Sequence, residues 1–205
     1  MATAQGGADE STRSLRFTWF NQMLGRFPVG SLIDLGSGHG MFARAAADAG
    51  WRVTALDARG DRYPDDEPRV EWKVGDVRDV DLRGFDVIAC LGLFYHLTLD
   101  DQLDLLARAS GTPIILDTHV ANDRPVPMKR SLSELVTLQG YTGKLYREPD
   151  QATNSPASFG NDHSFWPRTR DLYMMLGAHG YDVLTATPWY LPSRTFFLCL
   201  PQLDG

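Results

Sequence analysis

The sequence predicts an α/β fold built around a mostly parallel sheet, and three observations support that prediction. The run Leu32–Gly40 leads from apolar residues through an acid into glycines at alternate positions, directly before a helical pattern at 41–47. A series of short apolar runs follows, and an acid or a glycine stands at the end of each. Two strand-like runs near the end of the chain are separated by a turn too short for a helix.

The glycine run reads as a buried strand, a tight turn and a helix N-terminus. Glycine lets the backbone approach a ligand closely, and such turns hold nucleotide-like cofactors at the carboxyl edge of a sheet. A dinucleotide site needs G-x-G-x-x-G/A, but Met41 stands where the last small residue belongs. Asp34 would repel a pyrophosphate, whereas it suits a cationic amino-acid group. An NAD or flavin site is the less favoured alternative.

Acidic residues follow the next two predicted strands. Trp51–Leu56 leads into Asp57, about 20 residues after Gly36, where a carboxylate can accept both hydroxyls of a ribose. Val70–Val74 leads into Asp76 in the same way. Each run taken singly could be a plain buried strand with a solvated acid after it, but their order along the chain favours one shared site. The fourth and fifth predicted strands are Phe85–Leu91 and Ile114–Asp117.

The end of the chain separates this pattern from a dinucleotide-binding domain. Apolar residues at helical spacing from Asp171 stop at Gly180, and Asp182–Ala186 then reads as a strand. Only the short turn from Pro188 to Ser193 precedes the last strand, Thr195–Leu200. A turn of that length cannot hold a crossover helix, so we expect these two strands to pair antiparallel.

Together these motifs resemble the class I S-adenosylmethionine-dependent methyltransferases over residues 30–120 and 165–201. The resemblance implies a Rossmann-like, seven-stranded, mostly parallel sheet of order 3-2-1-4-5-7-6, with an antiparallel last strand and helices on both faces. It implies S-adenosyl-L-methionine as the cofactor and S-adenosyl-L-homocysteine as the product. In this family an acid at the place of Asp76 bonds the adenine amino group. The residues that the resemblance assigns to the cofactor are Asp34, Gly36, Ser37, Gly38, Asp57, Ala58, Asp76, Val77, Cys90 and Leu91.

Length and composition predict a single domain over residues 13–205, preceded by a disordered leader at 1–12 without signal-peptide features. No apolar run approaches the roughly 18 residues of a membrane span. Cys90 and Cys199 fall in predicted buried strands and read as core thiols, which favours a reducing, cytoplasmic compartment.

The charge balance bears on the partner. Proteins that bind nucleic acid gain affinity from Lys and Arg, but this chain has 20 basic and 26 acidic residues. A small-molecule acceptor is therefore favoured. Because basic residues are scattered between Arg124 and Arg170, an RNA substrate stays an alternative. The oligomeric state is not encoded in any motif, and a homodimer is one candidate.

The α/β rhythm is interrupted at 121–166, after the fifth strand, where Pro, Asn, Ser, Thr and aromatic residues take over. A structureless stretch this long is usually functional or disordered, and its aromatic content argues against disorder. We expect this insertion to cover the substrate at the methyl-donor end of the cofactor.

Two histidines are the catalytic candidates. His96 lies in a Tyr-His-Leu segment after the fourth strand, and His119 lies two residues past Asp117. Either could act as a base or orient the acceptor, although a packed, hydrogen-bonded histidine is the plainer interpretation of each. Correct positioning contributes more to methyl transfer than a base does. No metal is indicated.

Several transferases remain open as the function. The leading interpretation is methylation of a hydroxyl, or less readily an amine or carboxylate, on a small natural product or sugar-like acceptor. Tyr95-His96-Leu97 and Phe165-Trp166-Pro167 also resemble segments of the tRNA wobble-uridine carboxymethyl-transferring enzymes, so an RNA-modifying transferase is an alternative. A non-catalytic cofactor-binding or assembly subunit is another. Near the N-terminus, the helical run 15–25 places Arg16 or Trp19 as candidates to close over the methionine end.

Overall fold

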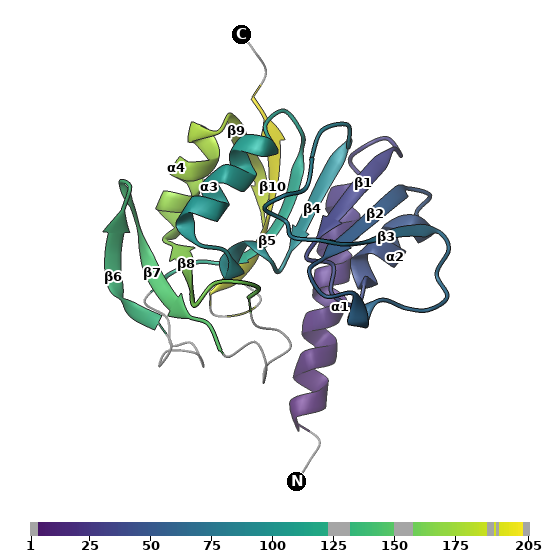
Figure 1. Cartoon of the computed structure of the whole chain (residues 1–205), viewed down its shortest axis with the longest axis horizontal. Helices are drawn as coiled ribbons and strands as arrows, with labels where there is room; N and C mark the ends of the chain where they lie inside the picture. Colours follow the sequence, from purple (N-terminus) through teal and green to yellow (C-terminus); the bar gives the residue numbers. More distant parts are fainter. Residues whose placement is uncertain (1–3, 123–131, 150–157, 188–190, 192, 203–205) are drawn as a thin grey trace.

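A seven-stranded sheet of order β3-β2-β1-β4-β5-β10-β9 forms the centre of the protein (Figure 1). The structure is a computed structural model, and it describes residues 4–122, 132–149, 158–187, 191 and 193–202, with side chains from residue 11 onward. The predicted order 3-2-1-4-5-7-6 is confirmed, because β9 and β10 are the sixth and seventh strands of this sheet. Its strands are β1 (Ser31–Leu35), β2 (Arg52–Asp57), β3 (Val70–Val74), β4 (Val87–Leu91), β5 (Ile114–His119), β9 (Tyr181–Ala186) and β10 (Arg194–Pro201).

The direction of the last strand also agrees with the prediction. Strands β1 to β5 pair in parallel, whereas β10 runs antiparallel to both β5 and β9. The carboxyl ends of the five parallel strands therefore lie at one edge of the sheet, beside the start of β10. Arg194 of β10 is paired there with His119 of β5. This edge holds the site described below.

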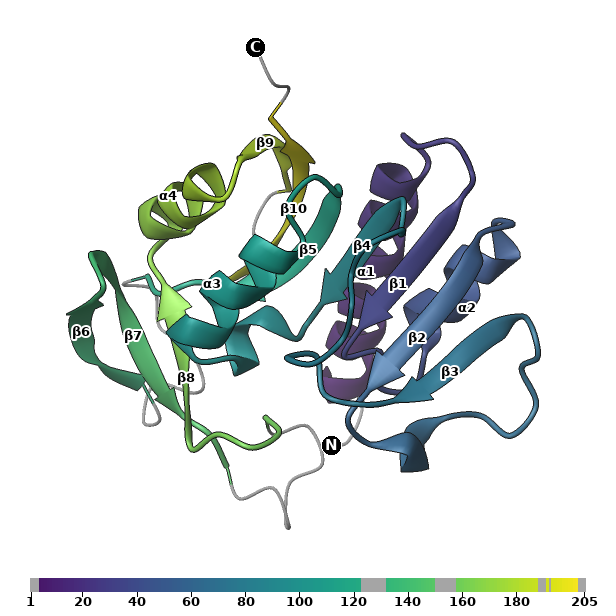
Figure 2. The same cartoon turned by 45° about the horizontal axis from the view of Figure 1, so that its top comes forward.

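Helices cover both faces of the sheet (Figures 1 and 2). One face packs against α1 (Ala4–Leu24) and α2 (Met41–Asp48) through a core that includes Phe20 and Ala43. The other face packs against α3 (Leu99–Arg108) and α4 (Thr169–Ala178). Because helices cover both faces, the central strands are fully buried: every residue of β1, β4 and β5 is inaccessible to solvent or nearly so.

The N-terminal helix corrects one prediction. α1 begins at Ala4, so residues 4–12 are helical rather than the expected disordered leader. The predicted helix end at Gly25 is confirmed, since α1 stops at Leu24. Figure 1 shows the first half of α1 standing away from the sheet, while Phe20, Met23 and Leu24 near its end are buried in the core.

A second, three-stranded sheet lies within 121–166, where a structureless cover was predicted. It consists of β6 (Leu132–Leu138), β7 (Tyr141–Arg147) and β8 (His163–Pro167), all antiparallel, at the left of Figure 1. The β6–β7 turn at Gln139 and Gly140 has positive φ at both residues (50° and 86°), as a tight hairpin requires. The remaining predicted cover residues, 123–131 and 150–157, lie outside the described part of the chain.

Two hydrogen bonds from β8 fasten the small sheet to the main body. The Phe165 backbone N–H donates to the carbonyl of Leu97 (3.0 Å), and the Trp166 indole donates to the carbonyl of Tyr95 (3.0 Å). Trp166 is 1% exposed. The sheet is thereby held against the turn that carries His96.

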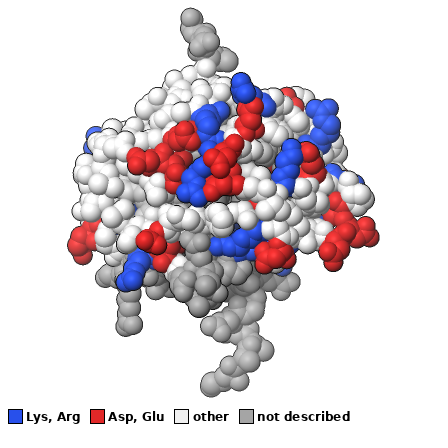
Figure 3. Space-filling model, viewed as in Figure 1, with Lys and Arg blue, Asp and Glu red and all other residues white. Residues whose placement is uncertain are grey.

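Surface charge is mixed on the face shown in Figure 3, where basic and acidic side chains are interspersed. In the described residues, no helix has both the length and the apolar character needed to cross a membrane.

Candidate active site

A cavity of about 250 Å³ opens at the carboxyl edge of the large sheet. The ends of β1 to β4, helix α1, the start of β10 and residues 158–159 all contribute to its wall. Six of the ten predicted cofactor residues line it: Gly36, Asp57, Ala58, Asp76, Val77 and Leu91. The other four are not among the described residues that line it, and they lie in β1, in the glycine turn and in β4: Asp34, Ser37, Gly38 and Cys90.

The glycine turn between β1 and α2 requires glycine for its conformation. Gly36, Gly38 and Gly40 have φ of 65°, 55° and 65°, in the left-handed region that a Cβ disfavours. A Cβ on Gly40 would also run into the ring of Trp72. The Gly38 N–H donates to Oδ2 of Asp57 (2.8 Å), which ties the turn to the end of β2.

Asp57 ends β2 and is 7% exposed. Its Oδ1 accepts the backbone N–H of Arg59 (2.9 Å), while Oδ2 accepts that of Gly38. An ionised carboxylate has about four acceptor positions, so these two bonds leave capacity for ligand hydroxyls. This geometry suits the predicted ribose contact.

Asp34 is a buried carboxyl with an unsatisfied oxygen. It lies in β1 between Ala55 of β2 and Ala89 of β4, and is 2% exposed. Among the described residues, its Oδ2 has no hydrogen-bond partner. Burial raises the pKa of Asp34 to about 7. A cationic group bound next to it would satisfy the oxygen and restore the ionised form, as expected for the ammonium of an amino-acid moiety.

Asp76 is paired within the chain. The Arg78 guanidinium binds both oxygens of Asp76, with Nε 2.8 Å from Oδ1, and this pairing lowers the pKa of Asp76. Arg78 also donates to the carbonyl of Phe159 (3.3 Å). Asp76 thus reaches the cavity with Arg78 beside it, and an adenine amino group would have to share the carboxylate.

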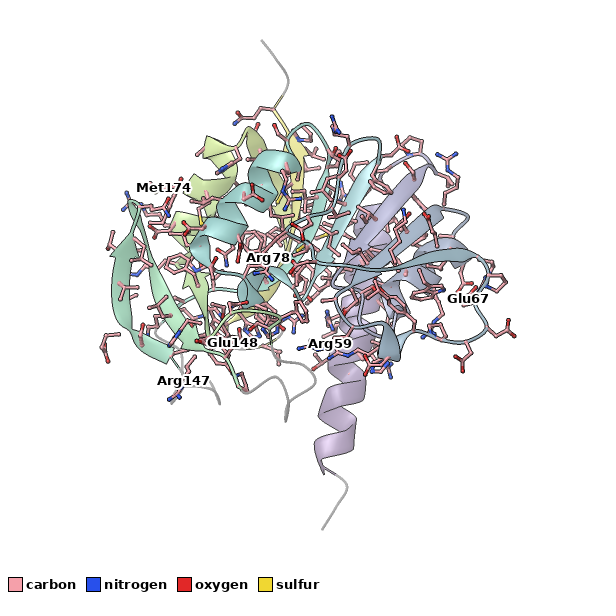
Figure 4. All side chains as sticks on the ribbon, in the orientation of Figure 1. Arg59, Glu67, Arg78, Arg147, Glu148 and Met174 are labelled. Atoms are coloured by element: carbon pink, nitrogen blue, oxygen red, sulfur yellow. The ribbon has the colours of Figure 1, made fainter. Side chains whose placement is uncertain are left out.

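The segment after β7 closes over the ends of β2 and β3. Arg59 donates to the carbonyl of Ser158 (3.2 Å), and its guanidinium lies 5.7 Å from the centre of the Phe159 ring. In Figure 4, Arg59 and Glu148 lie near the lower edge of the sheet, and Arg78 lies above them in the view. The predicted cover therefore reaches the side of the cavity that the ends of β2 and β3 form.

Two arginines bind one buried acid at the other end of the cavity. Asp117, near the carboxyl end of β5, is fully buried; its Oδ2 accepts from Arg16 Nε (3.0 Å) and its Oδ1 from Arg194 Nε (2.9 Å). Arg16 also donates to the carbonyl of Leu91 (3.1 Å). Arg16 is thus at the site as predicted, whereas Trp19 packs against Phe196 in the core.

His96 faces the cavity from the short turn η2 (Phe94–His96) after β4. Its Nδ1 lies 3.0 and 3.2 Å from the two carboxylate oxygens of Glu148. Glu148 was not predicted, because it lies 52 residues from His96 and belongs to no motif.

His119 occupies a packing position. It is 5% exposed, stacks on Trp166 with ring centres 4.5 Å apart, and its Nδ1 lies 2.7 Å from the Ser193 hydroxyl. Burial, together with Arg194, lowers the pKa of His119 to about 3. His119 is not among the described residues that line the cavity. Of the two predicted catalytic histidines, His96 is the one that lines the cavity in the described part of the chain.

A family model described as a methyltransferase domain matches residues 32–111. That range begins in β1 and includes the glycine turn, the tips of β2 to β4 and His96. This part of the chain, 80 of its 205 residues, is similar to the methyltransferase domains of class I. No curated protein matches the sequence. S-adenosylmethionine is the cofactor of this class.

Solved structures share the fold of this chain. The N-terminal domain of EvdMO1 with S-adenosylhomocysteine bound is 22% identical, with a TM-score of 0.68 over 98% of this chain and 82% of that one. The 1,6-didemethyltoxoflavin-N1-methyltransferase of Burkholderia thailandensis is 15% identical, with a TM-score of 0.61 over 98% and 82%. The glycopeptide N-methyltransferase MtfA with S-adenosylhomocysteine is 18% identical, with a TM-score of 0.57 over 90% and 86%.

The residues at and beside the cavity fit the cofactor of class I methyltransferases. The unsatisfied oxygen of Asp34 suits an ammonium group, and Asp57 retains acceptor capacity for a ribose. Within the described part of the chain, no group of three or more His, Cys, Asp or Glu side chains could hold a metal ion.

Proposed function

We propose that this protein transfers a methyl group from S-adenosylmethionine to a hydroxyl of a small natural-product or sugar-like acceptor. One observation supports the proposal most strongly: Asp57 and Asp76 line one cavity, and Asp34, whose Oδ2 has no hydrogen-bond partner among the described residues, lies in the neighbouring strand β1. Asp34 would hold the ammonium of the methionine moiety, Asp57 the ribose and Asp76 the adenine amino group. The glycine turn would pack against the ligand at Gly36, which lines the cavity.

The chain contributes mainly orientation to the reaction. S-adenosylmethionine supplies a methyl group bonded to a positively charged sulfur. Holding the acceptor in line with that methyl group can lower the barrier by about 7–11 kcal/mol, whereas a general base adds a factor of about 10²–10⁴. We assign the base to His96, which lines the cavity beside Leu91 and Tyr95. His119, buried and stacked on Trp166, would support the cavity wall.

A small acceptor is favoured over RNA. The net charge of −6 and the mixed charges of Figure 3 offer no broad basic surface on the face shown. Two of the similar structures are N-methyltransferases, one of 1,6-didemethyltoxoflavin and one of a glycopeptide. An amine or carboxylate acceptor, an RNA-modifying transferase and a non-catalytic cofactor-binding subunit remain the alternatives.

Cellular location and assembly are also proposals. The free thiols of Cys90 and Cys199 are buried, and burial raises the pKa of each to about 12. Unreactive core thiols fit a reducing compartment, so we place the protein in the cytoplasm. A homodimer remains a candidate assembly.

The proposal is tested by calorimetric titration with S-adenosylhomocysteine, followed by transfer of labelled methyl groups to an acceptor panel. Asp57→Ala should weaken binding by roughly 1–3 kcal/mol, because charge-assisted hydrogen bonds to the ribose are lost. The exposed Asp61→Ala in the adjoining η1 turn (Gly60–Arg62) is the matched control and should leave affinity unchanged.

Each alternative has its own outcome. Equal affinity of Asp57→Ala and wild type would refute the ribose assignment. Tight binding without transfer to any small molecule, but with transfer to RNA, would establish the RNA-modifying alternative. Binding with no transfer to either would favour the non-catalytic subunit.

A further inference from the structure

The contact between His96 and Glu148 determines which ring nitrogen is available to a substrate. Both oxygens of Glu148 lie within 3.2 Å of Nδ1, and the Glu148 side chain is 1% exposed. A carboxylate is an acceptor only, so Nδ1 of the neutral ring must carry the proton. The lone pair is then on Nε2. The His96 side chain is 19% exposed and lines the cavity.

Glu148 is fixed by contacts that do not involve His96. Its Oε2 accepts the backbone N–H of Ser158 (3.2 Å), and its own N–H donates to the carbonyl of Asp162 (2.9 Å). Ser158 in turn is held by Arg59 through its carbonyl. The Glu148 carboxylate is thus preorganised, so orienting it toward the His96 ring costs little free energy.

His96 is held from its backbone side as well. Its N–H donates to the carbonyl of Leu93 (2.7 Å), and its carbonyl accepts from the Asn161 side chain (3.1 Å). Asn161 and Glu148 belong to the two ends of the segment between β7 and β8. The catalytic turn is therefore completed by the insertion after β5.

We propose that Glu148 is a positioning residue that holds His96 as the Nδ1–H tautomer, with Nε2 ready to take a proton from an acceptor hydroxyl. This inference rests on the proposed function. The acceptor oxygen forms its bond to the methyl carbon as its proton moves to Nε2, and the C–S bonding pair stays on sulfur. The Glu148 carboxylate stabilises the imidazolium, which then gives its proton to solvent.

The pairing narrows the acceptor class. A hydroxyl holds its proton at neutral pH and gains from an oriented base, whereas a carboxylate is already ionised and gains nothing. A His–Glu pair beside the cavity therefore selects a hydroxyl acceptor over a carboxylate.

The tautomer can be measured without knowing the acceptor. Imidazole ¹⁵N shifts, with His96 assigned by comparison with His96→Gln, distinguish the two tautomers in the protein saturated with S-adenosylhomocysteine. We expect Nδ1–H to exceed Nε2–H by at least about tenfold in the wild type, the preference that one charge-assisted hydrogen bond provides. In Glu148→Gln this excess should be lost, because the amide can donate to Nδ1 instead. Glu148→Asp should retain part of the excess of the Nδ1–H tautomer. The exposed Glu134→Gln in β6 is the control and should retain all of it.

The outcomes separate this inference from the proposed function. A wild type that does not bind S-adenosylhomocysteine fails the proposed function, whatever the tautomer. Binding together with an Nε2–H tautomer in the wild type, or an unchanged tautomer in folded Glu148→Gln, would overturn the role of Glu148 alone. If Glu148→Gln does not fold, Glu148→Asp decides, and it should show a reduced excess of Nδ1–H.

Discussion

Replacing the buried carboxyl of Asp34 by an amide should change how stability depends on pH. Burial raises the pKa of Asp34 in the folded protein to about 7, from 3.8. Between these values the folded protein keeps the proton and the unfolded chain loses it, so stability falls as pH rises. Three pKa units at 1.36 kcal/mol each give a loss of about 4 kcal/mol, complete above pH 7.

Asp34→Asn removes this loss, since an amide does not ionise. The difference in unfolding free energy between variant and wild type should therefore move by up to about 4 kcal/mol in favour of the variant between pH 4 and pH 8. For a domain of this size, 1 kcal/mol corresponds to about 2–4 °C in Tm. Thermal melts of the ligand-free protein at half-unit pH steps would show it. The exposed Asp79→Asn is the control for removing one acid.

Two results would refute the reasoning. A constant difference in Tm between Asp34→Asn and wild type across this pH range would mean that the carboxyl is not buried uncharged. A variant that binds S-adenosylhomocysteine as tightly as wild type at pH 8 would remove Asp34 from the ammonium site.

Two further predictions concern the glycine turn and the second histidine. Gly40→Ala should destabilise the protein by at least about 1–2 kcal/mol, because φ is left-handed and the new Cβ meets Trp72. Gly177→Ala on α4, where nothing lies near the added Cβ, should instead stabilise by about 0.5–1 kcal/mol in the same urea titration. Equal effects would contradict the conformational argument. His119 has a pKa lowered from 6.5 to about 3, so it contributes a loss of stability as pH falls through that interval. His119→Asn should abolish this contribution in acid melts and leave S-adenosylhomocysteine affinity intact, and a weakened affinity would place His119 at the cofactor after all.

The main sheet could be predicted because acidic residues recur at or near the ends of its apolar strands. Asp34, Asp57 and Asp76 follow or end apolar runs, and the short turn before β10 allows only an antiparallel partner. The cofactor end of the site follows from the same residues. Those signals depend on local order along the chain, which a sequence shows directly.

The acceptor end was less predictable, since its contacts join distant parts of the chain. Glu148 meets His96 across 52 residues, and Arg194 meets Asp117 across 77. The β6–β7 hairpin did leave a signal, the Gln139–Gly140 turn between the two strand segments. The helical start of α1 left little signal in the sequence, because Gly6 and Gly7 lower helix propensity.

The central claim is that the carboxyl edge of the sheet binds a sulfur-bearing nucleoside. Isothermal titration of the purified protein with S-adenosylhomocysteine, and in parallel with NAD, tests it most directly. The account predicts saturable one-to-one binding of the first and no measurable heat from the second. Saturable NAD binding, or no binding of S-adenosylhomocysteine at millimolar concentration, would contradict it.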